Sequence, residues 1–163
     1  MIRIKPILSF SLAAAPLCIL PAHAQFGGPK VATVTAVPRP AAVVRGGKGL
    51  LFVTISVGPK YHINAHQPND SAYIPTYFRG QPRSGITFGA ARYPAAKTVK
   101  VSYSAKPLLV YTGRVVISVP YTVSKSAKPG TTALAGTVSF QGCDDKSCYP
   151  PATAPVSTVV IVK

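Results

Sequence analysis

Short stretches rich in β-branched and apolar residues, separated by Gly- and Pro-rich turns, fill most of this chain. No apolar pattern with a 3.6-residue period is long enough to predict a helix. Many short strands with such turns are typical of an all-β sandwich or barrel. The pattern predicts strands at 31–37, 49–57, 61–66, 71–78, 85–90, 97–103, 108–123, 131–140 and 156–163.

Two of these stretches allow finer predictions. The stretch 108–123 is long for one strand, and Thr112-Gly113 predicts a bend or bulge within it. Alternate residues of a strand share a face, so the apolar set of this stretch should point into the core (Val115, Ile117, Val119). The same reasoning places Val159 and Ile161 inward on the last strand. Pro75 interrupts 71–78, which predicts an edge piece.

The first 24 residues have the pattern of a secretory signal peptide. Arg3 and Lys5 precede an apolar stretch that is too short to span a bilayer comfortably. Ala22-His23-Ala24 then offers small residues to a signal peptidase, so we expect cleavage after Ala24, with Cys18 leaving in the peptide. We therefore expect an exported protein that is periplasmic or otherwise extracytoplasmic. We expect 25–48 to form an N-terminal strand and linker and 49–163 to form the domain.

The chain is strongly basic. It has 18 Lys and Arg residues against three acids, and without Arg3 and Lys5 the net charge is +13. Such a charge favours weak association with anionic surfaces. The basic residues are scattered, whereas a nucleic-acid binder concentrates them on one element, so we expect no nucleic-acid partner. Glutamate is absent, and the side chains of the adjacent Asp144 and Asp145 would point apart on a strand, which argues against a paired-carboxylate hydrolase.

The two remaining cysteines lie in the sequence QGCDDKSCYPP, with four residues between them. This spacing suits a tight hairpin in which Cys143 and Cys148 face each other across the neck. In an exported protein the pair should be oxidised at least part of the time. As a staple the bridge contributes only about 2 kcal/mol on the chain-entropy estimate, because the ring that it closes is small.

Three other functions remain open on the residues alone. The bridge could be purely structural in a binding or adhesion module. It could form a copper or zinc site with His62 and His66, although histidines four apart on a strand lie roughly 13 Å from each other. A catalytic thiol with a histidine base is also conceivable, but no residue to orient the histidine is evident.

The order of motifs from Tyr61 onward is similar to a known family. The segments KYHINAHQPND, RYPAAKTVKVSY, LLVYTGRVVISVPYTV and PGTTALAGTVSFQGCDDKSCYPP resemble the amino-terminal periplasmic domain of the transmembrane thiol:disulfide interchange protein DsbD. The most specific element is Gln-Gly-Cys, a short loop, then Cys-Tyr-Pro-Pro. The resemblance implies an all-β, immunoglobulin-like β-sandwich in which Cys143 and Cys148 are a redox-active pair, with Cys148 holding the mixed disulfide.

The resemblance also implies supporting residues around the bridge. Members of the family place tyrosines near it on the strand that matches 61–66, where this chain has Tyr61, His62 and Asn64. They cover the bridge with a cap loop, here 102–107, in which Tyr103 is the single aromatic residue. Tyr149 follows the second cysteine and, with the prolines after it, should stiffen the return strand.

Family membership implies electron transfer between a thioredoxin-like donor and oxidised exported proteins. Full-length members continue into a membrane-embedded redox domain and a thioredoxin-like domain, whereas this chain ends at Lys163. We therefore expect the membrane redox donor to be supplied in trans, to a monomer without a cofactor. The direction of electron flow stays open, and so does the question whether the chain acts as a protein-disulfide reductase.

Overall fold

The computed structural model describes residues 29–83 and 85–163, so the expected signal peptide and Cys18 lie outside the described residues. Across those two ranges the protein is built of strands, and no helix is long and apolar enough to cross a membrane. The strands are β1 (Ala32–Arg39), β2 (Ala42–Val43), β3 (Lys48–Val57), β4 (His62–Asn64), β5 (Tyr77–Gln81), β6 (Ile86–Phe88), β7 (Lys97–Val99), β8 (Leu108–Tyr111), β9 (Arg114–Val123), β10 (Gly130–Phe140), β11 (Gly142–Cys143) and β12 (Ala152–Val162).

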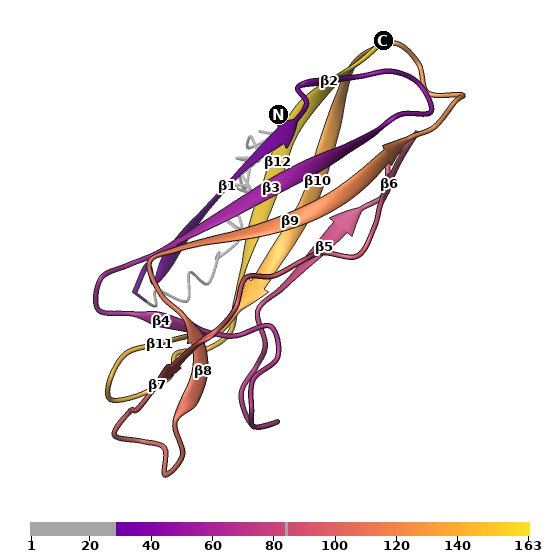
Figure 1. Ribbon diagram of the computed structural model, residues 1–163. Helices are drawn as coiled ribbons and strands as arrows, with labels where there is room; N and C mark the ends of the chain where they lie inside the picture. The colour runs from indigo at the N-terminus through magenta and orange to yellow at the C-terminus, as the bar shows by residue number, and fades with distance from the viewer. Residues whose placement is uncertain (1–28, 84) are drawn as a thin grey trace, which may run out of the picture.

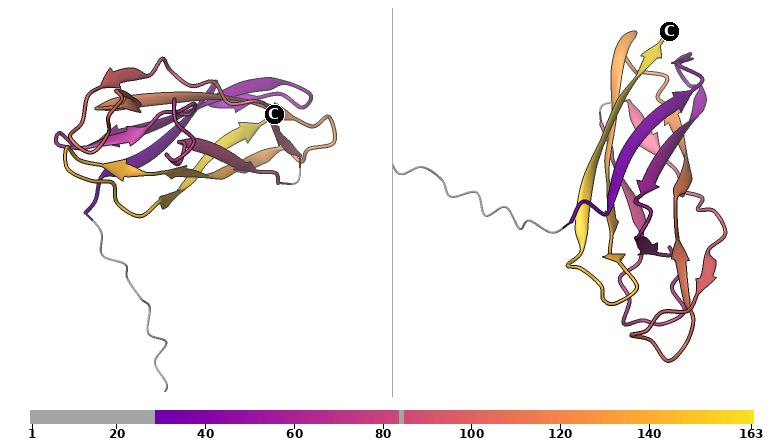
Figure 2. Two further views of the ribbon diagram at one scale, coloured as in Figure 1. Left: turned by 90° about the horizontal axis from the view of Figure 1, so that it is seen from below. Right: turned by 90° about the vertical axis from the view of Figure 1, so that its left-hand side faces the viewer.

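Two four-stranded sheets pack face to face (Figures 1 and 2). One has the order β1-β3-β9-β6, and its strands pair antiparallel throughout. The other has the order β2-β12-β10-β5, in which only the short β2 runs parallel to its neighbour. The protein is thus an all-β, immunoglobulin-like sandwich, which confirms the predicted fold class.

The core lies between the two sheets and follows from alternation along the strands. In β9, Val115, Ile117 and Val119 are buried as predicted, and the residues between them are more exposed. Strand β3 shows the same period, with Leu51, Val53 and Ile55 fully buried, as are Leu134, Val138 and Val160 from the opposite sheet.

The prediction for the last strand is wrong. Val159 and Ile161 are 54% and 49% exposed, whereas Val156, Val160 and Val162 are buried. The segment 159–162 is apolar at every position, so it does not itself fix which face turns inward. The polar Ser157 is exposed and shares the outer face with Val159 and Ile161, so it is the residue that indicates which face of the strand points to solvent.

A third sheet, of order β11-β4-β8-β7, lies at the end of the sandwich away from the C-terminus (Figure 1). The predicted bend at Thr112-Gly113 is confirmed: it separates β8 from β9, and Gly113 has φ +62°. A side chain is rarely tolerated at this backbone angle, so glycine lets the chain pass from the third sheet into the sandwich. This sheet has its own small core, which consists of Val101, Leu108 and Val110 with Tyr73, Val99 and Tyr103 packed against it.

Some predicted strands are shorter or displaced. The stretch 71–76 forms a loop, and the strand there, β5, begins at Tyr77. Pro75 cannot donate a ladder hydrogen bond, which accounts for the shift. The predicted strands 61–66 and 97–103 contract to β4 and β7, so residues 102–107 are free to form a loop over β4. At the N-terminus, β1 pairs along its whole length with β3 as an edge strand of the sandwich.

Candidate functional site: a disulfide at the end of the sandwich

The chain enters the site where β10 leaves the sandwich and continues into β11 of the third sheet. Gly142 makes this passage possible, because a Cβ there would lie only 2.6 Å from Cγ1 of Val31. Beyond it, Cys143 pairs with His62 of β4, and Tyr149 N–H donates a hydrogen bond of 2.8 Å to the Gly142 carbonyl. The hairpin predicted from the cysteine spacing is thereby held from both sides.

Cys143 and Cys148 form a disulfide across the neck of this hairpin, where they also pair as an isolated antiparallel bridge. The two cysteines differ in exposure. Cys143 is 0% exposed, whereas Cys148 is only partly buried. The Cys148 side of the bridge is therefore less enclosed than the Cys143 side.

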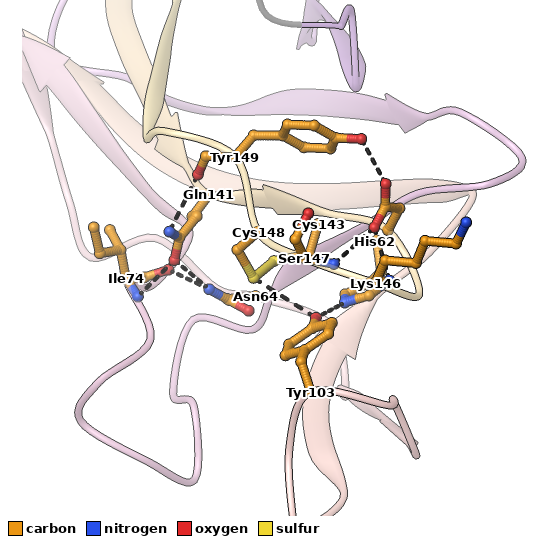
Figure 3. Close-up of a disulfide and its surroundings, with 11 residues drawn as sticks. His62, Asn64, Ile74, Tyr103, Gln141, Cys143, Lys146, Ser147, Cys148 and Tyr149 are labelled. Carbon is orange, nitrogen blue, oxygen red and sulfur yellow. Dashed lines mark hydrogen bonds between the residues drawn. A yellow bond between two sulfur atoms is a disulfide. The ribbon is translucent and has the colours of Figure 1, made fainter.

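The loop between the cysteines is organised by Asp144. Its Oδ1 accepts hydrogen bonds of 2.8 Å from the backbone N–H groups of Lys146 and Ser147, and its Oδ2 accepts one of 2.6 Å from the Tyr149 hydroxyl (Figure 3). The hydrogen bond from Tyr149 lowers the pKa of Asp144 to about 2, assisted by the two backbone donors. The same bond raises the pKa of Tyr149 to about 12, because ionised Tyr149 would face the carboxylate.

Tyr103 covers the disulfide from the loop 102–107. Its hydroxyl oxygen lies 3.0 Å from Nε2 of His62 and 3.6 Å from Sγ of Cys148 (Figure 3). A disulfide sulfur carries no proton, so in this oxidised state only the hydroxyl can donate along the second contact. The loop is also tied to the cysteine loop, since the Ser102 hydroxyl donates a 2.6 Å hydrogen bond to the Asp145 carbonyl.

Burial shifts the pKa values of both partners in this contact. Burial raises the pKa of Tyr103 to about 12, and Tyr73 and Asp144 add to the rise. Burial lowers the pKa of His62, which is 6% exposed, while the nearby Asp144 carboxylate opposes that shift. His62 is therefore predominantly neutral near neutral pH, and Tyr103 keeps its proton.

A second polar cluster, formed around Asn64 and Gln141, lies next to the hairpin. Asn64 is 1% exposed, and its side-chain N–H groups donate hydrogen bonds of 3.1 Å to the Ile74 carbonyl and to Oε1 of Gln141. Gln141 Nε2 in turn donates to the Tyr149 carbonyl at 3.2 Å. Gln141 thus connects β4 to the return strand of the hairpin. Gln141 was not predicted as a supporting residue, although it is the first residue of the Gln-Gly-Cys motif.

The remaining candidates are placed differently. Tyr61 contacts Tyr149 edge-on, with ring centroids 6.0 Å apart. His66 stacks on Tyr93 at 3.7 Å and bonds the Thr76 carbonyl through Nδ1, so its partners are not those of His62. Within residues 29–83 and 85–163, no three His, Cys, Asp or Glu side chains gather in a way that could hold a metal ion.

A groove of about 590 Å³ opens beside the site. Its lining is mainly basic, with three exposed lysines and one acid, and Tyr61 and His62 form part of its wall. The charged lining residues are Lys60, Lys100, Lys146 and Asp145, and Tyr61, His62, Val99 and Val101 complete most of the wall.

The fold and the site together define a class: an all-β sandwich domain that carries a disulfide hairpin, partly open to solvent, at one end. The sequence profile of the N-terminal domain of the thiol:disulfide interchange protein DsbD matches residues 32–159, which is most of the chain. The chain belongs to this family. No curated protein matches it.

Among solved structures, the chain is similar to the N-terminal domain of DsbD from Neisseria meningitidis in its reduced form. The identity is 17% and the TM-score 0.48, over 83% of this chain and 91% of the other. The N-terminal periplasmic domain of ScsB from Proteus mirabilis aligns at 12% identity and a TM-score of 0.47, over 78% of this chain and 44% of that one. Both TM-scores lie below 0.5.

Proposed function

We propose that this protein is an extracytoplasmic thiol–disulfide exchange domain that relays electrons through the Cys143–Cys148 pair. The observation that carries the proposal is the unequal exposure of the two cysteines, together with membership of the DsbD N-terminal family. A bridge that only stapled the hairpin would not require one of its cysteines to be partly exposed while the other is buried.

The exchange chemistry follows from that asymmetry. A thiolate of a reduced partner attacks Sγ of Cys148, the Cys143–Cys148 bond breaks, and Cys143 leaves with the electron pair and takes up a proton. A second thiol of the partner then attacks the mixed disulfide and releases Cys148, so the partner is oxidised and the domain is reduced. The reduced domain passes the two electrons on when Cys148 attacks the disulfide of an oxidised protein and Cys143 resolves the intermediate.

The partners that this proposal implies are thioredoxin-fold proteins and oxidised exported proteins. A membrane redox donor acting in trans, a monomeric state, a periplasmic location and weak association with anionic surfaces are further parts of it. The lysines of the groove support contact with an acidic partner face, because they put positive potential beside the bridge.

Trapping of mixed disulfides tests the proposal. In Cys143→Ala the reachable Cys148 remains, and it should capture a thioredoxin-fold protein in the native compartment. The matched control is Cys148→Ala, which leaves only the buried Cys143 and should capture little. Equal capture by the two variants would contradict the assigned roles.

The reduction potential of the pair provides an independent check. Structural disulfides of secreted proteins lie below about −300 mV, whereas exchangeable ones lie higher. We expect this couple to lie above that value and to equilibrate rapidly with a thioredoxin-fold reductant. Resistance to such a reductant in the folded protein would leave only a structural bridge.

A further inference from the structure

The hydroxyl of Tyr103 lies between an ionisable base and the reachable sulfur of the disulfide. It is 3.0 Å from Nε2 of His62 and 3.6 Å from Sγ of Cys148 (Figure 3). The three groups come from separate parts of the fold, namely β4, the loop 102–107 and the cysteine loop. Three elements thus bring the sulfur of Cys148 and the imidazole of His62 into contact with the same hydroxyl.

Reduction of the disulfide changes what these contacts can do. In the oxidised protein Cys148 has no proton, so within its contact with Tyr103 the hydroxyl is the group that can donate. In the reduced protein the Cys148 S–H can donate to the Tyr103 oxygen while the Tyr103 O–H donates to Nε2 of His62. A continuous path for a proton then leads from the thiol to the imidazole.

We propose that His62 is the proton acceptor for the Cys148 thiol, with the Tyr103 hydroxyl as the bridge between them. The Cys148 proton passes to the Tyr103 oxygen as the Tyr103 proton passes to Nε2 of His62. This leaves a thiolate and an imidazolium with no change in net charge. The thiolate then attacks the disulfide of an oxidised partner, and the partner's leaving sulfur takes the electron pair. The inference rests on the proposed exchange function.

The charges around the three groups are compatible with this role. Burial keeps the His62 imidazole neutral and able to accept, and the carboxylate of Asp144 favours its protonated form once the proton arrives. Because its pKa is about 12, Tyr103 passes a proton on and does not remain ionised. The groove side of His62 presents Lys60, Lys100, Lys146 and Asp145, and Tyr73 faces Tyr103. The lysines favour the thiolate and oppose the imidazolium.

The acidity of Cys148 in the reduced protein tests the proposal without any partner. The full protein is reduced chemically, and iodoacetamide labelling of Cys148 is followed by peptide mass spectrometry across pH. The midpoint of the rate profile gives the thiol pKa, and its plateau at high pH reports access to the sulfur, so the two effects separate.

We expect Tyr103→Phe and His62→Gln each to raise the Cys148 pKa by about one unit. At a pH below the pKa, the thiolate fraction would then fall about tenfold. The double variant should show no further rise, because both residues act through one path. Tyr73→Phe is the matched control: Tyr73 packs in the same small cluster as Tyr103, and its variant should keep the wild-type pKa. An unchanged or lowered Cys148 pKa in Tyr103→Phe overturns the proposal.

The titration of His62 supplies a second readout, which also decides the matter if His62→Gln does not fold. By NMR, the His62 pKa should be higher in the reduced protein than in the oxidised one, because only the thiolate can pair with the imidazolium. Identical titration in the two redox states overturns the relay, even if the disulfide exchanges with thioredoxin-fold proteins. Conversely, a coupled titration without any partner exchange would separate the relay from the proposed function.

Discussion

The hydroxyl of Tyr149 donates a 2.6 Å hydrogen bond to the carboxylate of Asp144, across the loop that the disulfide closes. This contact joins the residue after the first cysteine to the residue after the second. Together with the hydrogen bonds that the backbone N–H groups of Lys146 and Ser147 donate to Asp144, it holds the loop through contacts that do not involve the sulfurs.

The Asp144–Tyr149 contact predicts a specific dependence of stability on pH. The folded pKa of Asp144, about 2, lies below its ordinary value of 3.8, so its contribution is complete above pH 3.8 and is lost as the pH falls toward 2. Asp144→Asn keeps an acceptor for the backbone N–H groups but loses the charge. Urea unfolding of the oxidised protein should show Asp144→Asn less stable than wild type at neutral pH, with the gap closing near pH 2.

Tyr149→Phe is the companion variant, because it removes the other partner of the same hydrogen bond. The pKa of Tyr149 is raised from 10.0 to about 12, so its contribution is present below pH 10 and lost as the pH rises through 12. A stability gap between Asp144→Asn and wild type that did not vary between neutral and acid pH would show that the carboxylate charge is not what holds the loop.

A shielding role for Tyr103 predicts faster reduction of the disulfide when its ring is removed. The half-buried ring lies over the Cys148 side of the bridge, which is the side that an attacking thiolate must approach. We expect Tyr103→Ala to raise the second-order rate constant for reduction by a small neutral thiol. Tyr103→Phe keeps the ring and loses only the hydroxyl, so it should raise the rate less than Tyr103→Ala does. If Tyr103→Ala reacted at the wild-type rate, the ring would not be a cap.

The basic groove predicts that the charge of an attacking thiol matters. Lys60, Lys100 and Lys146 line it with Asp145 as the one acid, so an anionic thiol should reduce the disulfide faster than a cationic thiol of similar size. At about 0.01 M salt the preference should be several-fold, up to roughly tenfold, and at about 1 M it should nearly vanish because the Debye length is then about 3 Å.

Lysine variants locate the origin of that preference. Replacement of the three groove lysines by glutamine should remove most of it, with a larger fall in the rate for the anionic thiol than for a thiol whose other groups are neutral. Replacement of Lys125 and Lys128, which lie in the turn between β9 and β10, is the control for net charge and should leave the preference intact. Equal losses in both sets would mean that the overall charge of the protein, and not the groove, selects anionic thiols.

The sequence was sufficient for the fold class because alternation and turn residues are local signals. The positions of Val115, Ile117 and Val119 and the bend at Gly113 could be predicted from neighbours a few residues away. The start of β5 at Tyr77 was predicted less well: Pro75 indicates an interruption, but the pairing of Tyr77 with Ser139 of the distant β10 sets where the strand begins. Strand β2 was missed since it is two residues long and pairs with β12 from the far end of the chain.

The site was only partly predictable for the same reason. The cysteine spacing predicted the hairpin, and the family resemblance pointed to His62, Asn64 and Tyr103. No local signal indicates that Tyr103 reaches both His62 and Cys148, which lie 41 and 45 residues away in sequence. In the sequence Asp144 is notable only as one of two adjacent acids, whereas the structure makes it the acceptor that organises the loop.

The corrected phase of the last strand gives a prediction from two adjacent valines. Val160 is 0% exposed and packs in the core, whereas Val159 is 54% exposed on the outer face of the same strand. Val160→Ala should lower the free energy of unfolding by about 2 kcal/mol or more, because it removes two buried methyl groups and leaves a cavity. Val159→Ala should change it by less than about 0.5 kcal/mol. Urea unfolding of the two variants side by side measures the difference, and a larger loss in Val159→Ala would mean that β12 presents its other face to the core.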